Sequence, residues 1–173
     1  RPAPGTWWTL RSHMYRPPVV ERWRAEDGGL DVDEIAAIRP GSEVSWARAF
    51  AVDGEQWWAV VEDAQGACAL VGAAGRARPL PWLPPGAAIH ALAADGDGLV
   101  AAFAPVDGRG RPLPARVARL GRDGALRGAP RRLADDEPLP PALDRGPIPR
   151  ARVAGEKIVF SLRDAAGRPL APR

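Results

Sequence analysis

Few side chains in this sequence could do acid–base or metal chemistry. His13 and His90 are the only histidines, and Cys68 is the only cysteine. A metal site needs several converging ligands, and the sequence holds no H-x-x-x-H or C-x-x-C pair. No serine lies in a G-x-S-x-G setting, and the apolar residues around Cys68 predict a buried, unreactive thiol. The sequence therefore predicts no metal site, no cofactor and no catalytic residue.

One acidic turn comes nearest to a cation site. Asp95 and Asp97 alternate with Gly96 and Gly98, and oxygen ligands at alternate positions suit Ca²⁺. A helix-loop-helix calcium loop also needs a glutamate at its twelfth position, where Val106 stands. A hairpin turn is therefore the favoured interpretation of this segment.

Tryptophan is the most unusual residue type in the chain. There are seven tryptophans against one tyrosine and three phenylalanines. In a strand, the adjacent Trp57 and Trp58 point to opposite faces, so both faces of that sheet must be covered. Tryptophan and arginine are also enriched at binding hot spots. We expect binding residues in two loops, namely Trp46 with Arg48 and, further along, Trp82.

The elements that position these residues follow from an internal repeat. Residues 51–63 align without a gap with residues 93–105, 42 positions further on, and residues 153–164 follow the second copy at an offset of 59. Each copy is a short apolar strand, a polar turn with glycine and a second strand rich in β-branched or aromatic residues. In the first two copies the turn contains Asp-Gly, which supplies the positive φ angles of a tight turn. These segments are predicted to be β-hairpins.

A second hairpin is predicted behind each of the first ones. The pairs of strands are 18–24 with 30–32, 67–71 with 77–82, and 115–120 with 126–133. An alternative at residues 30–39 is a helix, because Val32, Ile35 and Ile38 approach helical spacing. Pro40 and Gly41 follow at once, and the matching segments read as strands, so a strand is favoured. Residues 6–12 resemble the second strand beginning at Trp57, with its first strand missing.

Paired hairpins at spacings of 42 to 59 residues resemble the blades of a β-propeller. WD40-type repeats run about 40 to 45 residues and Kelch-type repeats about 50. The Trp-Asp and Gly-His dipeptides of WD40 repeats are absent. The resemblance implies an all-β chain of antiparallel four-stranded blades. It would be a single repeat-built domain over 1–173 with units 1–40, 41–86, 87–143 and 144–173, forming an incomplete ring or segment of about three and a half blades.

The composition is that of a soluble folded chain, with 46% hydrophobic and 26% charged residues. All but one of the 24 basic residues are arginines, which is typical of a GC-rich bacterial genome. They are scattered among 21 acidic residues, so no nucleic-acid surface is expected. No apolar run reaches the roughly 18 residues of a membrane span, and none is expected. The sequence does not determine the cellular compartment, and an extracytoplasmic one is slightly favoured.

Two functions remain. The first is a non-catalytic protein-binding or scaffolding module, with Trp46, Arg48 and Trp82 at the interface. Its partner would be another protein, or a second copy that completes the sheet edges. The alternative is part of an extracytoplasmic propeller enzyme or carbohydrate-binding protein. In that case Asp53 and Asp95, at equivalent turns, should converge on one pocket.

Overall fold

In a computed structural model of the chain, the described residues are 5–13, 16–26, 29–38, 45–133, 148–154, 157–163 and 169–170. The chain divides into two compact units, Arg1–Glu137 and Pro138–Arg173, and each is described by itself. All regular elements in these ranges are β-strands, so the all-β prediction is confirmed. None of the described segments forms a helix that could cross a membrane. The single domain expected over 1–173 stays a prediction.

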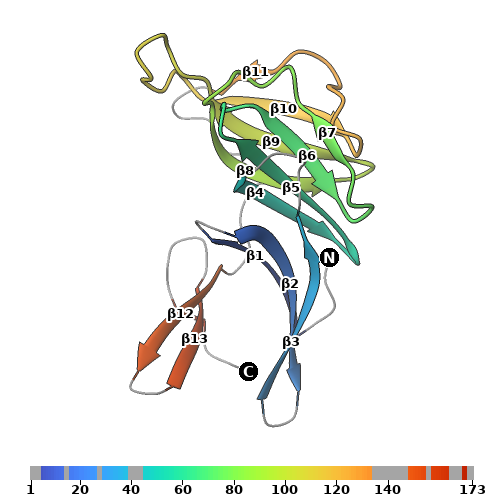
Figure 1. The fold of residues 1–173 in the computed structure, drawn as a ribbon, viewed down its shortest axis with the longest axis vertical. Helices are drawn as coiled ribbons and strands as arrows, with labels where there is room; N and C mark the ends of the chain where they lie inside the picture. Colours follow the sequence, from blue (N-terminus) through green and yellow to red (C-terminus); the bar gives the residue numbers. More distant parts are fainter. Residues whose placement is uncertain are drawn as a thin grey trace. The chain divides into compact units, whose positions relative to one another are not determined.

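The first unit holds three antiparallel sheets whose strands follow one another in chain order (Figure 1). The first sheet contains β1 (Thr6–His13), β2 (Arg16–Glu26) and β3 (Gly29–Ala37). The second contains β4 (Ser45–Asp53), β5 (Gln56–Asp63), β6 (Cys68–Gly72) and β7 (Ala77–Pro79). The third contains β8 (Ala88–Asp95), β9 (Gly98–Ala104), β10 (Arg116–Gly121) and β11 (Arg131–Arg132).

The second unit holds one antiparallel sheet with the order β12-β13-β14. Its strands are β12 (Ile148–Ala154), β13 (Lys157–Arg163) and β14 (Pro169–Leu170). The repeated hairpins predicted from the sequence are thus present as β4 with β5, β8 with β9, and β12 with β13. The segment at 29–37 is strand β3, because it pairs along β2, and the helical alternative is wrong.

The hairpin turns use glycine in a different position from the expected one. Asp53 pairs with Gln56, so the two turn residues are Gly54 and Glu55 rather than Asp53 and Gly54. Gly54 has a φ of 59°, whereas no residue other than glycine has a positive φ among those described. A positive φ at the first turn residue alone is the pattern of a type II′ turn, which matches the right-handed twist of the strands. Gly96 repeats this geometry, also with a φ of 59°.

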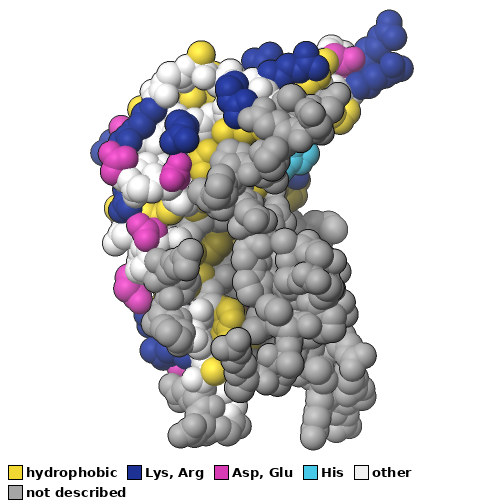
Figure 2. All heavy atoms as spheres, turned by 180° about the vertical axis from the view of Figure 1, so that it is seen from behind, with side chains coloured by type: hydrophobic (Ala, Val, Ile, Leu, Met, Phe, Trp, Pro, Cys, Tyr) yellow, Lys and Arg dark blue, Asp and Glu magenta, His cyan; other side chains and the backbone are white. Residues whose placement is uncertain are grey.

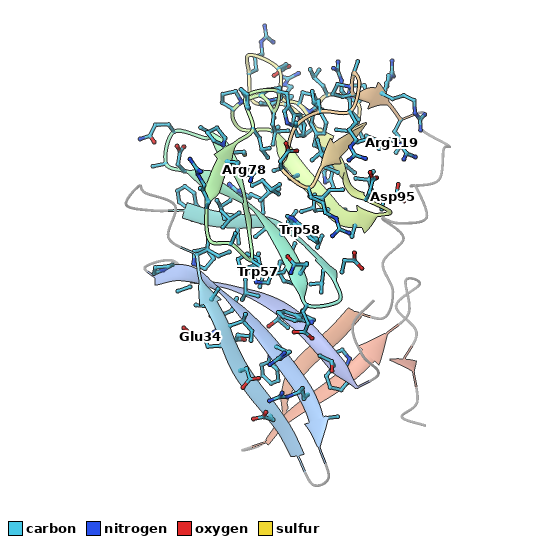
Figure 3. All side chains as sticks on the ribbon, turned by 90° about the vertical axis from the view of Figure 1, so that its right-hand side faces the viewer. Glu34, Trp57, Trp58, Arg78, Asp95 and Arg119 are labelled. Carbon is cyan, nitrogen blue, oxygen red and sulfur yellow. The ribbon has the colours of Figure 1, made fainter. Side chains whose placement is uncertain are left out.

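Both faces of the middle sheet, β4 to β7, are covered. Trp57 is only 2% exposed and packs in a cluster with Val20 of the first sheet. Trp58 is 5% exposed and packs in a second cluster with Leu99 and Phe103 of the third sheet. Figure 3 shows the two indoles on opposite sides of β5. The predicted division of this tryptophan pair is confirmed, and it makes β4 to β7 the middle layer of a three-sheet stack.

The sheets also meet along their first strands. β4 lies beside β8, and β1 lies beside β4. Two ion pairs connect neighbouring sheets: Arg22 lies 2.9 Å from Glu55, and Arg122 lies 2.7 Å from Asp53. The described sheets of this unit therefore stack on one another, and they do not show a closed ring.

The outer edge strands β7 and β11 carry exposed charge. Arg78 lies on β7 beside Pro79, and Arg131 and Arg132 make up β11. Arginine side chains gather along the upper end of this unit in Figure 2. Charged residues and proline on an edge strand discourage pairing with another chain. These arginines have a structural explanation that requires no ligand.

Candidate functional site

Trp46 lies at the beginning of β4 and not in a loop, so the expected loop position is wrong. The ladder between β4 and β5 continues to Ser45 and Asp63, and Trp46 pairs across the strands with Glu62. Its side chain is 38% exposed, which makes it one of the few large hydrophobic residues at the described surface. Part of its apolar ring area is therefore accessible at the surface of the protein.

Arg48 is placed by a β-bulge in the same strand. Ala47 pairs with Val61 and Ala49 with Val60, so Arg48 is the extra residue of β4. Such bulges re-aim a side chain without ending the strand. Here the Arg48 guanidinium lies 5.9 Å from the centroid of the Trp46 ring.

Glu62 completes the arrangement. The Arg48 Nε donates a hydrogen bond to the Glu62 carboxylate, whose side chain is only 10% exposed, while the Arg48 side chain is 43% exposed. We call Trp46, Arg48 and Glu62 the Trp46 cluster. The sequence indicated the first two residues but not Glu62, because only the strand register brings it opposite Trp46.

In the Trp46 cluster, Glu62 is nearly buried, whereas Trp46 and Arg48 are partly exposed. A carboxylate that is largely removed from water must keep its hydrogen-bonded partner, so Glu62 fixes the position of Arg48. Stacking of an arginine on an indole adds about 0.5 to 1 kcal/mol at an exposed site. The remaining N–H groups of Arg48 are suited to bind a carbonyl or carboxylate of a ligand.

Cys68 lies beside the Trp46 cluster, but its thiol is not activated. It is buried, and burial together with the nearby charge of Glu62 raises its pKa to about 11. Because the thiolate is the reactive form, this thiol is a poor nucleophile at neutral pH. The prediction of a buried thiol is confirmed.

Trp82, the third predicted binding residue, is partly buried and packs against the core. It lies in the loop between β7 and β8, as expected, but its ring packs edge-on against Phe103, with centroids 5.6 Å apart. The Trp82 Nε1 donates a hydrogen bond of 3.2 Å to the carbonyl oxygen of Gly124. Its indole therefore holds this loop against the third sheet.

The turn aspartates each face a different arginine. Asp53 lies 2.7 Å from Arg122, and Asp95 lies 3.1 Å from Arg119, a pair visible in Figure 3. Arg127, 2.6 Å from Asp97, lowers the pKa of that carboxyl by hydrogen bonding. Each of these three carboxylates therefore pairs with a different arginine.

The two histidines lie on different strands of the first unit. His90 is exposed on β8, where it is the extra residue of a bulge between Ile89 and Ala91. It occupies the position 42 residues after Arg48, so the two sheets share this bulge. His13 ends β1, and its side chain lies outside the described ones. In the described part of the chain, no three His, Cys, Asp or Glu side chains gather where they could hold a metal ion.

The Trp46 cluster is the most distinctive group of side chains at the surface of the described residues. Its chemistry is an indole face, an oriented guanidinium and the carboxylate that orients it. No family model, no curated protein and no solved structure matches this chain.

Proposed function

We propose that this chain is a non-catalytic protein-binding or scaffolding module built from stacked, blade-like sheets of the β-propeller type. The observation that carries the proposal is the Trp46 cluster. It joins a 38% exposed tryptophan to an arginine that a nearly buried glutamate holds in place. Tryptophan and arginine dominate the binding energy of protein interfaces, particularly where they are already ordered.

The propeller part of the proposal is supported by the way the sheets stack. Two of them have four strands in chain order, their first strands β4 and β8 lie side by side, and the middle sheet is apolar on both faces. Blades of a propeller have these three features, with the first strands nearest the axis. An incomplete ring or segment of such blades is the architecture that we propose.

The alternative of an enzyme or carbohydrate-binding propeller receives no support from the turns. It requires Asp53 and Asp95 to meet in one pocket. Arg122 and Arg119 instead neutralise them separately. A protein partner fits the Trp46 cluster better, because a protein can offer an apolar side chain to the indole and a carboxylate to Arg48.

The test is a comparison of variants in the binding of a partner protein. The wild-type chain is immobilised on a resin and exposed to an extract of its source organism. A polypeptide that the resin retains is then purified, and its binding to the chain is measured by calorimetry. Trp46→Ala should weaken binding by about 30-fold, the effect of losing a hot-spot residue. Leu113→Ala is the matched control, because Leu113 is another exposed large apolar residue, at 42%, and its loss should change little.

Two outcomes would contradict the proposal. The first is that the extract yields no polypeptide that binds the purified chain in calorimetry. The second is that a bound polypeptide has the same affinity for wild type and Trp46→Ala, which would remove the Trp46 cluster from the interface.

A further inference from the structure

The connection between β9 and β10 contains a turn that its own hydrogen bonds hold in place. The backbone amides of Arg109 and Arg111 both donate to Oδ1 of Asp107, at 2.8 and 2.9 Å. The amide of Asp107 donates to the carbonyl oxygen of Arg111, and the amide of Gly110 donates to that of Asp107, both at 2.9 Å. Gly110 takes the positive φ that closes the turn, 74°. These bonds give the turn a fixed backbone conformation.

The middle sheet has the same turn between β5 and β6. The amides of Gln65 and Ala67 both donate to Oδ1 of Asp63, at 2.9 Å each, and Gly66 has a φ of 80°. Gln65 and Ala67 therefore occupy the positions that arginines occupy in the third sheet. The two sheets share one backbone turn and differ in the side chains that it presents.

In the third sheet this turn is carried outward. The turn of the middle sheet follows β5 directly, whereas residues 105–115 separate β9 from β10. Val106 forms a β-bridge with Pro112, and the amide of Leu113 donates a hydrogen bond of 2.7 Å to the carbonyl oxygen of Pro105. We call residues 105–115 the arm, and it projects beyond the sheets at the upper left of Figure 1. Prolines and internal hydrogen bonds order the arm without a neighbouring strand.

The arginines of the arm have no structural partner. Arg109 and Arg111 are exposed, the space beside Gly110 is open, and neither arginine forms an ion pair with a described residue. By contrast, Arg119 and Arg127 each pair with an aspartate. Protection of a sheet edge does not explain the two arginines either, because the arm belongs to no sheet.

The chemistry of the arm favours carboxylates as its ligands. Guanidinium groups form their strongest hydrogen bonds with carboxylates and phosphates. Residues 105–115 contain no aromatic side chain on which a base could stack, and two arginines are few for contacts along a nucleic-acid backbone. Because the backbone of the arm is already ordered, a ligand does not have to order it. An acidic stretch of protein fits these features best.

We propose that the arm binds an acidic segment of another protein through Arg109 and Arg111. The proposal goes beyond the proposed function, because it uses residues outside the Trp46 cluster and holds whether or not that cluster binds a partner.

The test measures binding of a fluorescein-labelled octaglutamate peptide by fluorescence anisotropy at low salt, about 20 mM. Arg109→Gln with Arg111→Ala gives the arm the side chains of the other turn and leaves its backbone hydrogen bonds in place. This arm variant should weaken binding by at least about 5-fold, the effect of losing two exposed ion pairs. Arg76→Gln with Arg78→Ala is the matched control, because it removes the same charge from two other exposed arginines. It should weaken binding by less than about 2-fold.

Three results would overturn the proposal. The first is that the wild type does not bind the peptide. The second is an equal loss of affinity in the arm variant and the control variant, because binding would then follow net charge. The third is that single-stranded DNA of about the same length binds more tightly than the peptide and loses this advantage in the arm variant.

Two further measurements keep the outcomes distinct. Circular dichroism verifies that the variants are folded, and if the double arm variant is not, Arg109→Gln alone takes its place. Trp46→Ala should bind the peptide as the wild type does, so a failure of the Trp46 cluster as a binding site is seen separately from a failure of the arm.

Discussion

At the scale of single residues, the same side-chain type serves different purposes according to what covers it. Trp57 and Trp58 fill the two faces of one sheet, Trp82 holds a loop, and Trp46 remains 38% exposed beside Arg48. The residue type alone indicates apolar area and one N–H donor. The neighbours decide whether that area stabilises the fold or is available to a partner.

Substitution of two tryptophans should separate these roles. Trp82→Ala should lower the free energy of unfolding by about 3 kcal/mol, because it removes a ring that packs on Phe103 and a hydrogen bond to Gly124. Trp46→Ala should lower it by less than about 1 kcal/mol, because the indole is already half in water. Urea denaturation of both variants measures the difference. Equal losses would mean that Trp46 is also a core residue.

Cys68 gives the folded chain a pH dependence at alkaline pH. Its pKa is raised from 9.0 to about 11 on folding, so between these values the folded chain binds its proton more firmly than the unfolded chain does. Stability from this group is therefore complete below pH 9 and falls as the pH rises toward 11. Cys68→Ala should flatten the decline in unfolding free energy measured between pH 8.5 and pH 10.5. Identical slopes for wild type and variant would contradict the raised pKa.

At the scale of elements, the hairpins depend on a short turn and on the register that it sets. The pairing of Asp53 with Gln56 leaves two residues to reverse the chain, and Gly54 takes the positive φ that this needs. A bulge then shifts the pairing at Arg48, and a second bulge does so at His90. The turn therefore sets the register, which determines the residues that face the core. The bulge changes the direction of the side chain at its extra residue, Arg48 or His90.

The glycine of the turn should be costly to replace. Gly54→Ala should destabilise the chain by about 1 to 2 kcal/mol, because φ is 59° while no atom crowds the added methyl group. Gly108 is the control, since its surroundings are also open and its φ is not positive. Gly108→Ala should change the thermal midpoint little. A similar effect at both positions would mean that the backbone angle of Gly54 is not the cause.

At the scale of the whole molecule, the first unit is held together by sheet packing more than by charge. Trp57 and Trp58 each lose nearly all their exposure between sheets, and burial of side chains of this size contributes several kcal/mol. The ion pair between Arg122 and Asp53 is about 40% exposed on both sides and contributes less than about 1 kcal/mol. This exposed ion pair therefore contributes little to the stability of the sheet stack.

The sequence by itself determined the strands, the hairpins and the opposite burial of Trp57 and Trp58. Strand alternation and glycine turns are local properties, and the 42-residue repeat shows them twice, so no distant contact was needed to find them. Only the tertiary structure decided that Trp82 packs against the core and that Arg48 meets Glu62. These depend on register shifts and on packing between segments far apart in the chain, and a β-bulge of one residue leaves no reliable trace in the sequence.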